Sequence, residues 1–268
     1  MIVETTDKVA QTWGKIHEQN PSVYKIRDPI HIGRLRNREF AQIIDRICSF
    51  SQHASILEAG CGSGRDTLYF STLGYRCVAL DISPIPLRHV NAAKAQYGSR
   101  FRNTSLDLTT ITGEVFHLPF SDDSFDLVFN SGVAEHYSEE LRRSLFREMG
   151  RVTKPQGFVC IAVPNKLHVF EPIWSRLIGR YTEKMSYDIP EDALSAEQLV
   201  REMETVGLVT VYYDWIDTYD TISHYPSWIP LKVLNYIARI VLPRPPRSVR
   251  MRFGKRIVVI GRKIQDGR

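Results

Sequence analysis

The residues best suited to chemistry are three glycines in a short turn and a carboxylate beside them. Gly60, Gly62 and Gly64 follow an apolar run that ends at Ala59, and Glu58 precedes that residue. Glycines allow a tight turn and a close approach of the backbone to a ligand, and the helix expected after the turn offers N–H groups. The order of strand, glycine-rich turn and helix is typical of nucleotide-binding sites. Taken alone, it fits NAD as well as other adenosine ligands.

Acidic side chains around the turn favour a cationic ligand. Asp81 ends the next apolar run, 17 residues after Gly64, where a carboxylate can accept both hydroxyls of a ribose. Glu114 follows the third run, and Glu58 borders the turn itself. The pyrophosphate of a dinucleotide would be repelled by these carboxylates, whereas S-adenosylmethionine carries a cationic sulfonium and a cationic amino group. The acidic setting therefore favours S-adenosylmethionine, although Glu58 could instead cap the local turn.

Four segments between residues 56 and 164 follow one another in a characteristic order. They are residues 56–64, 78–83, 113–126 and 148–157, with Glu135-His136 before the last. In order and spacing they resemble the class I S-adenosylmethionine-dependent methyltransferases, in the style of those that modify quinones, lipids and secondary metabolites. The resemblance implies an enzyme that transfers a methyl group in line from S-adenosylmethionine to a small, partly apolar acceptor.

The resemblance also implies roles for the matching residues. The glycines would line the methionine part of the cofactor with Glu58 near its amino group, and Asp81 would hold the ribose hydroxyls. Ile82 would pack on the adenine, Glu114 would accept from its amino group, and Val115 would offer a backbone N–H to the ring. The family usually has Asp and Ala at these last two positions. The expected cofactor-binding set is Glu58, Ala59, Gly60, Cys61, Gly62, Gly64, Asp81, Ile82, Ser83, Glu114, Val115, Asn130, Ser131 and Gly132.

His136 is the candidate catalytic residue. It follows the fourth expected strand, close to where a methyl acceptor would sit, and could act as a general base. The resembled family often carries a histidine there without a catalytic role, so a structural role is the alternative. Methyl transfer depends mainly on aligning the acceptor with an already activated methyl group. Cys61 is interpreted as a small residue that fills the turn, and no metal-binding constellation is expected.

The elements needed to position these residues alternate between strand and helix. This pattern predicts a Rossmann-like, doubly wound α/β fold with a seven-stranded, mostly parallel sheet. Strands are expected at residues 55–59, 77–80, 108–112, 125–129, 158–163, 208–213 and 256–261. Helices are expected at residues 40–50, 65–73, 86–97 (ended by Gly98), 138–152 and 195–206, with a tight turn at 155–157.

The predicted organisation is a single α/β domain with attachments. Residues 1–54 form a helical N-terminal cap and substrate region, 55–165 the cofactor-binding core, and 166–268 the rest of the domain. Aromatic-rich insertions at 166–193 and 214–255 are expected to act as lids. The acceptor should bind beyond the carboxyl ends of the strands, although the aromatic residues could equally form a small core of their own. Further candidates for this region are Trp13, His17, Tyr24, His31, Arg34, Arg36 and Arg38.

Composition and charge narrow the setting. The chain has 268 residues, 43% of them hydrophobic, and no uninterrupted apolar run of about 18 residues that could span a membrane. Charges among residues 1–11 argue against a signal peptide, and four scattered cysteines favour free thiols in a reducing compartment. A cytoplasmic protein, monomeric or homodimeric, is expected.

The basic charge of the chain lies in its C-terminal tail. The net charge is +5, but residues 244–268 alone carry +8. Residues 226–256 join an apolar helical face to this charge, which allows peripheral contact with an anionic membrane or, alternatively, packing as a lid or dimer contact. No recognisable nucleic-acid module accompanies the tail, which argues against a nucleic-acid partner. The alternative functions are a non-catalytic S-adenosylmethionine-binding protein, an RNA methyltransferase that uses this tail, and an NAD-dependent oxidoreductase.

Overall fold

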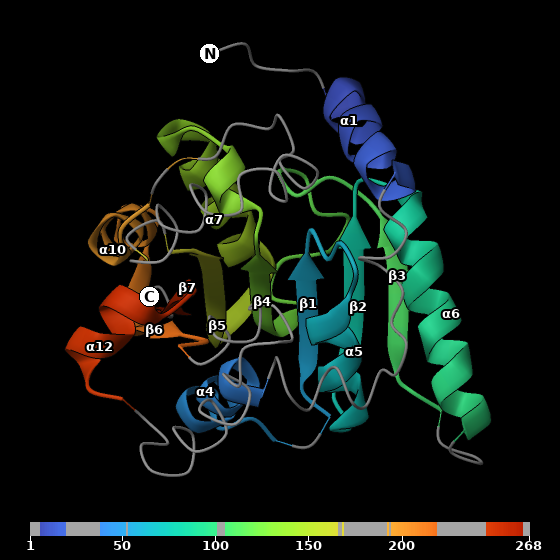
Figure 1. Cartoon of the computed structure of the whole chain (residues 1–268), viewed down its shortest axis with the longest axis horizontal. Coiled ribbons are helices and arrows are strands. Elements are labelled where there is room, and N and C mark those ends of the chain that lie inside the picture. The colour runs from blue at the N-terminus through green and yellow to red at the C-terminus, as the bar shows by residue number, and fades with distance from the viewer. Residues whose placement is uncertain are drawn as a thin grey trace, which may run out of the picture.

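The architecture is a seven-stranded sheet with helices on both faces (Figure 1). The structure, a computed structural model, describes residues 6–19, 38–51, 53–100, 105–165, 168, 192, 194–218 and 245–264. The strands are β1 (Ser55–Ala59), β2 (Arg76–Asp81), β3 (Leu108–Thr112), β4 (Phe125–Ser131), β5 (Thr153–Pro164), β6 (Leu208–Ile216) and β7 (Arg256–Lys263). The predicted fold class is confirmed.

The strand order is β3-β2-β1-β4-β5-β7-β6, and β7 runs antiparallel to both of its neighbours. The pairs from β3 to β5 are all parallel. The parallel strands therefore end at one edge, called the carboxyl edge below. Arg256, at the start of β7, pairs with Pro164 at the end of β5, so this strand begins at the same edge.

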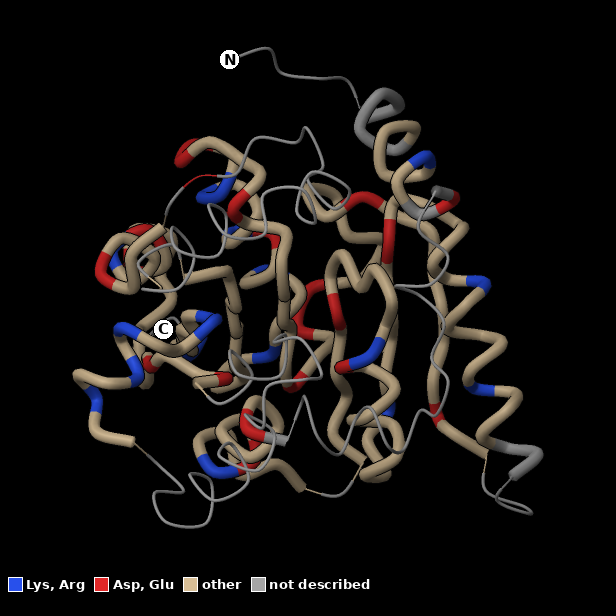
Figure 2. The backbone as a smooth tube through the Cα atoms, in the orientation of Figure 1, with Lys and Arg blue, Asp and Glu red and all other residues tan. Residues whose placement is uncertain are grey.

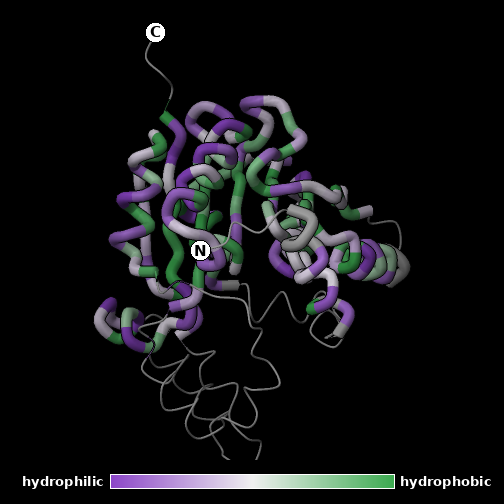
Figure 3. Tube along the Cα trace, turned by 90° about the horizontal axis from the view of Figure 1, so that it is seen from above, coloured by the Kyte–Doolittle hydropathy of each residue, from purple (hydrophilic) through white to green (hydrophobic). Residues whose placement is uncertain are grey.

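The helices cover the two faces of the sheet. Those in the described residues are α1 (Thr6–Gln19), α4 (Arg38–Cys48), α5 (Arg65–Thr72), α6 (Pro84–Arg100), α7 (Glu139–Val152), α10 (Ala196–Glu204) and α12 (Arg247–Phe253), together with a 3-10 turn, η1 (Ala134–His136). Phe40 of α4 and Phe70 of α5 pack on one face, whereas Phe146 of α7 and Leu199 of α10 pack on the other. Figure 3 shows the hydrophobic segments gathered in the strands between these helices.

Three elements, α6, β6 and β5, have a boundary that differs from the predicted one by three residues or more. Helix α6 begins at Pro84 and continues through Gly98 to Arg100, because an interior glycine weakens a helix by only about 1 kcal/mol without ending it. Strand β6 continues to Ile216, so Trp215, expected in an insertion, is buried at 4% exposure. Residues 155–157 lie within β5 rather than before it. There the pairing moves from Phe125↔Thr153 to Leu127↔Phe158, so the expected turn is a bulge in the strand.

Two predicted helix starts are confirmed, Ser138 before α7 and Ser195 before α10, but only one of them has a side-chain cap. The Oγ atom of Ser195 accepts the backbone N–H of Gln198 at 3.1 Å and caps α10. Ser138 precedes α7, but its side chain makes no capping hydrogen bond. The Gln198 side chain donates to Glu202 at 2.9 Å instead of completing a capping box.

Much of the expected acceptor region lies outside the described residues. This holds for most of residues 166–193, for 219–244 of the second insertion, and for Tyr24, His31, Arg34 and Arg36. His17 lies in α1 and Arg38 in α4, but their side chains are also outside that part. Within the described ranges, the helices are too short or too polar to cross a membrane.

Candidate functional site

The turn between β1 and α5 is formed by three glycines in the left-handed backbone region. Gly60, Gly62 and Gly64 have φ values of 80°, 48° and 61°. A Cβ atom on Gly60 would lie 2.7 Å from Val133, and one on Gly64 would lie 2.4 Å from Val90. Among the residues that the structure describes, a Cβ atom on Gly62 would meet no heavy atom within 4 Å. Packing therefore requires glycine at the outer two positions, whereas the described residues leave space beside Gly62.

The N–H groups of this turn are engaged inside the protein. Those of Gly60 and Cys61 donate to the Leu80 carbonyl at 2.9 and 2.8 Å. The Gly62 N–H donates to the Asp81 carboxylate, and the Gly64 N–H to the Cys61 carbonyl, both at 2.8 Å. The turn is thus tied to the end of β2 by its own backbone.

Asp81 ends β2 with its carboxylate held in place. One oxygen accepts the Gly62 N–H at 2.8 Å and the other the Ser83 N–H at 2.9 Å. The residue is only 6% exposed, and this burial raises the pKa of its carboxyl even though both hydrogen bonds oppose the shift. Ser83 lies at the start of α6, with Ile82 between the two residues.

Glu58 caps helix α5 from the end of β1. Its Oε2 atom accepts the backbone N–H of Thr67 at 3.1 Å and also the Thr67 hydroxyl. Burial at 3% exposure raises the pKa of Glu58 well above its ordinary value, and the carboxylate of Asp66 adds to this shift. Glu58 therefore has the capping role that the sequence left open as an alternative. Its contact with the amino group of a cofactor stays a prediction. Figure 2 marks acidic positions near the ends of β1 and β2.

Glu114 and Val115 begin the loop after β3. The Gly113 N–H donates to the Asp81 carbonyl at 3.0 Å, which brings the start of this loop to the end of β2. The Glu114 side chain is 29% exposed and lies 3.6 Å from the His117 ring. Val115 is buried in the core beneath it. The two candidate adenine contacts are thus adjacent to the candidate ribose carboxylate.

The end of β4 forms the other side of the candidate site. Asn130 is fully buried and its side-chain amide donates to the Ala59 carbonyl at 2.9 Å, which links β4 to β1. Gly132 has φ of 80°, and its N–H donates to the Ala162 carbonyl at 2.9 Å. Ser131 accepts a hydrogen bond from Arg256 at 3.2 Å. Backbone contact from Gly132 to a cofactor would therefore use its carbonyl.

Turn η1 places His136 against the N-terminal helix. The rings of His136 and Trp13 are 5.1 Å apart at an interplanar angle of 68°. Further along α1, a Cβ atom on Gly14 would lie 3.8 Å from Ile85 and 3.9 Å from Ser83. Helix α1 therefore reaches from the start of α6 to η1, and Figure 1 shows it above the end of β2.

Neither a metal nor a cysteine nucleophile is indicated. In the described ranges, no group of three or more His, Cys, Asp or Glu side chains is placed to hold a metal ion. Cys48, Cys61, Cys77 and Cys160 are buried free thiols. Burial raises the pKa of Cys61 well above its ordinary value, so its thiol is not activated.

Comparison with known proteins identifies the family. Residues 57–161 match a family model described as a methyltransferase domain. The "Uncharacterized methyltransferase YodH" of Bacillus subtilis (strain 168) is 29% identical over 203 residues, which are 67% of this chain and 82% of that protein. A malonyl-[acyl-carrier protein] O-methyltransferase of Pectobacterium atrosepticum is 27% identical over 143 residues, 53% of this chain and 51% of that protein. Residues 57–161 are thus a methyltransferase domain, and the relatives support an S-adenosylmethionine-dependent methyltransferase.

The solved structures agree with this assignment at the level of the fold. A chain of the complex between the Haloferax volcanii Trm112 methyltransferase activator and a methyltransferase superposes with a TM-score of 0.60. The sequence identity is 17%, and the match covers 94% of this methyltransferase and 99% of that chain. These findings support a methyltransferase and not the NAD-dependent oxidoreductase considered from the sequence.

Tyr137 lies in the same site and was not predicted. Its ring packs edge-on against Phe116 at 4.9 Å. Burial, with the carboxylates of Glu114 and Asp81, raises the pKa of the Tyr137 phenol to about 12. Its carbonyl accepts a hydrogen bond from the buried Arg142 of α7. The sequence places Tyr137 directly after His136, but only the sheet order brings it near β2 and β3.

Arg256 is a second residue that sequence reasoning missed. Its guanidinium lies 3.9 Å from the carboxylate of Asp66 in α5, donates to Ser131 at the end of β4, and pairs with Asp217 after β6. It is thus a cation placed among the carboxylates of Asp66 and Asp217 at this edge. Because β7 enters the sheet antiparallel between β5 and β6, no local spacing in the sequence could have placed it there.

Proposed function

We propose that this methyltransferase binds S-adenosylmethionine across the ends of β1, β2, β3 and β4 and methylates a small, partly apolar acceptor. The observation that carries the proposal is the open space beside Gly62, bordered by the preorganised carboxylate of Asp81. Curated relatives include S-adenosylmethionine-dependent methyltransferases, and the family implies this cofactor.

The residues at this edge fit the cofactor. Each carboxylate oxygen of Asp81 accepts one backbone N–H and keeps capacity for a ribose hydroxyl. Glu114 presents a partly exposed carboxylate to the adenine amine, and Gly62 leaves room for the methionine part. The remaining members of the set predicted from the sequence belong to the same proposal, as does the division into 1–54, 55–165 and 166–268.

The acceptor side is assigned to η1 and α1. The bound cofactor supplies a methyl group already activated on its sulfonium. The protein then has to align an acceptor atom with it and exclude water. His136 is only partly buried and packs edge-on against Trp13, so it could take a proton from an acceptor hydroxyl or serve as an aromatic wall. An aromatic wall suits a partly apolar acceptor.

Calorimetry tests the cofactor assignment. S-adenosylmethionine and S-adenosylhomocysteine should bind, and NAD should not. Asp81→Ala should weaken S-adenosylhomocysteine binding roughly 100-fold, because two charge-assisted hydrogen bonds are worth about 3 kcal/mol together. Unchanged affinity in this variant would refute the ribose assignment.

Turnover tests the enzymatic proposal. The wild-type protein should form S-adenosylhomocysteine when S-adenosylmethionine is mixed with pools of quinones, phenols or lipids, and mass spectrometry would identify the methylated product. If the protein binds S-adenosylmethionine but no pool yields a product, a non-catalytic cofactor-binding protein would be favoured instead. Product formation on RNA alone would favour the RNA alternative.

A further inference from the structure

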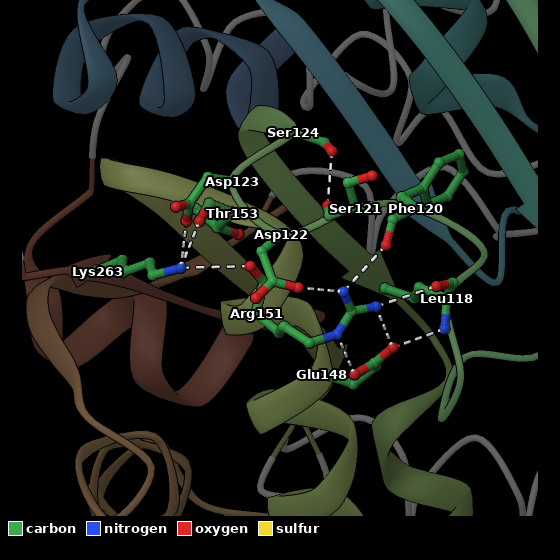
Figure 4. A network of polar contacts seen from close by, with 10 residues as sticks. All are labelled: Leu118, Phe120, Ser121, Asp122, Asp123, Ser124, Glu148, Arg151, Thr153 and Lys263. Atoms are coloured by element: carbon green, nitrogen blue, oxygen red, sulfur yellow. Dashed lines mark hydrogen bonds and ion pairs between the residues drawn. The ribbon is translucent and has the colours of Figure 1, made fainter.

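An ion pair on α7 holds the loop between β3 and β4 (Figure 4). Arg151 donates to the carbonyl of Leu118 at 3.1 Å and to the carbonyl of Phe120 at 3.0 Å. Glu148 accepts the Leu118 N–H at 2.8 Å. Both main-chain groups of Leu118 are therefore bound by this one pair.

The pair is well suited to act as a rigid clamp. The two side chains bond in a bidentate manner, with Nε–Oε2 and Nη2–Oε1 distances of 2.9 and 2.7 Å. Arg151 also bonds Asp122 at 2.6 Å. The hydrogen bonds from Arg151 lower the pKa of Glu148, so the pair stays ionised near neutral pH. The planar guanidinium fixes the geometry in a way that a lysine ammonium could not.

The clamp limits the freedom of the candidate adenine contacts. The loop begins at Gly113, whose N–H donates to the Asp81 carbonyl at 3.0 Å. Only residues 114–117 separate this anchor from Leu118. The turn is also closed within itself, because the His117 N–H donates to the Glu114 carbonyl at 3.3 Å. A turn this short, anchored at both ends, can hold Glu114 and Val115 in only a few arrangements.

We propose that Glu148 and Arg151 are positioning residues for adenine recognition. By fixing Leu118, they place the Glu114 carboxylate and the Val115 N–H before the cofactor arrives, which lowers the ordering cost of binding. The proposal rests on the S-adenosylmethionine site proposed above. It assigns part of the selectivity for a 6-amino purine to a salt bridge that acts through the loop backbone.

The rest of the loop has its own anchors, so the pair can be removed without releasing the whole segment. The N–H groups of Asp123 and Ser124 donate to the carbonyls of Arg151 and Val152 at 3.1 and 2.9 Å. Lys263 of β7 binds Asp123 at 2.7 Å. Because these contacts do not use the side chains of the pair, Glu148→Ala and Arg151→Met should still fold.

The test measures discrimination between two purines. Calorimetry compares S-adenosylhomocysteine with S-inosylhomocysteine, in which a carbonyl replaces the 6-amino group. Glu148→Ala and Arg151→Met should narrow the wild-type preference for the adenine compound roughly three- to thirtyfold, the range typical of indirect positioning. Glu148→Gln, which can still accept the Leu118 N–H, should retain more of the preference.

Matched controls come from the same helix. Glu139 and Arg143 form an exposed ion pair one turn apart on α7, so Glu139→Ala and Arg143→Met should leave the preference unchanged. Thermal unfolding of every variant shows whether each is folded at the assay temperature. If the Glu148 and Arg151 variants lose thermal stability but keep the full preference, the pair is only structural and the inference is overturned. If the wild-type protein binds neither compound, the proposed cofactor site itself is refuted.

Discussion

Two glycines with similar surroundings but different positions allow a direct test of where the cofactor lies. Gly62 and Gly74 both have positive φ, 48° and 93°, and a Cβ atom on either would meet no atom of the described residues within 4 Å. Gly62 borders the candidate site, whereas Gly74 follows α5 at the opposite end of that helix. Alanine at each position therefore imposes a similar backbone cost but adds its methyl group to a different space.

The expected sizes follow from these geometries. An L-residue in the left-handed region costs about 1–2 kcal/mol, so Gly62→Ala and Gly74→Ala should each lower the free energy of unfolding by that amount. If the cofactor fills the space beside Gly62, an added methyl group there overlaps with it and weakens its binding free energy by about 1–3 kcal/mol. The Kd for S-adenosylhomocysteine should then rise roughly 5- to 150-fold in Gly62→Ala. Gly74→Ala should bind as the wild type does.

The assays are urea unfolding for stability and calorimetry for binding. Gly64→Ala provides an upper reference for stability, because its Cβ atom would lie 2.4 Å from Val90. It should lose more stability than either of the other two variants. Wild-type affinity in Gly62→Ala would refute the placement of the cofactor beside this turn. Equal loss of affinity in Gly62→Ala and Gly74→Ala would show that backbone strain, and not occupied space, explains the effect.

The remaining predictions concern charge and catalysis. Burial raises the pKa values of Glu58 and Asp81, so these groups take up protons at a higher pH than ordinary carboxylates. As the pH falls through these raised values, calorimetry should show S-adenosylmethionine losing more affinity than S-adenosylhomocysteine, which lacks the sulfonium charge; parallel pH profiles would contradict this. Arg142→Met leaves the carboxylate of Glu202 buried without its 2.8 Å partner, which should cost about 3–5 kcal/mol in urea unfolding. His136→Gln should lower the turnover rate roughly 100-fold or more at unchanged S-adenosylhomocysteine affinity if the imidazole is a general base; nearly full turnover would leave His136 its packing role against Trp13.

Local sequence signals predict the cofactor half of the fold well. The bounds of β1 and β3 agree with those expected, because each is a short run of strand-forming residues that ends directly before a glycine. Where the prediction failed, a long-range contact decided the outcome. Trp215 belongs to β6 because it pairs with Ile257 of β7, a partner that no local pattern shows. The continuation of α6 through Gly98 has a local cause instead, because a long helix tolerates one unfavourable residue.

In the candidate site, too, local sequence signals place some residues and long-range contacts place the others. Asp81 and the glycines lie where their spacing predicts, since all belong to one consecutive unit that runs from β1 through the turn and α5 to the end of β2. Tyr137 and Arg256 reach the site only through the order of the strands. The acidic side chains around the turn are weaker evidence for a cationic ligand than the sequence indicated, because the Glu58 carboxylate is engaged in capping α5.

The choice between S-adenosylmethionine and a phosphate-bearing cofactor therefore needs a reason other than repulsion by Glu58. The backbone of the turn provides one. A phosphate binds such a turn through unpaired N–H groups, but those of Gly60, Cys61, Gly62 and Gly64 all donate within the protein at 2.8–2.9 Å. Binding a pyrophosphate at these four N–H groups would require breaking these bonds, including the one that orients Asp81. A phosphate-free cofactor can use the turn as it stands, with its ribose on Asp81 and its methionine part over Gly62.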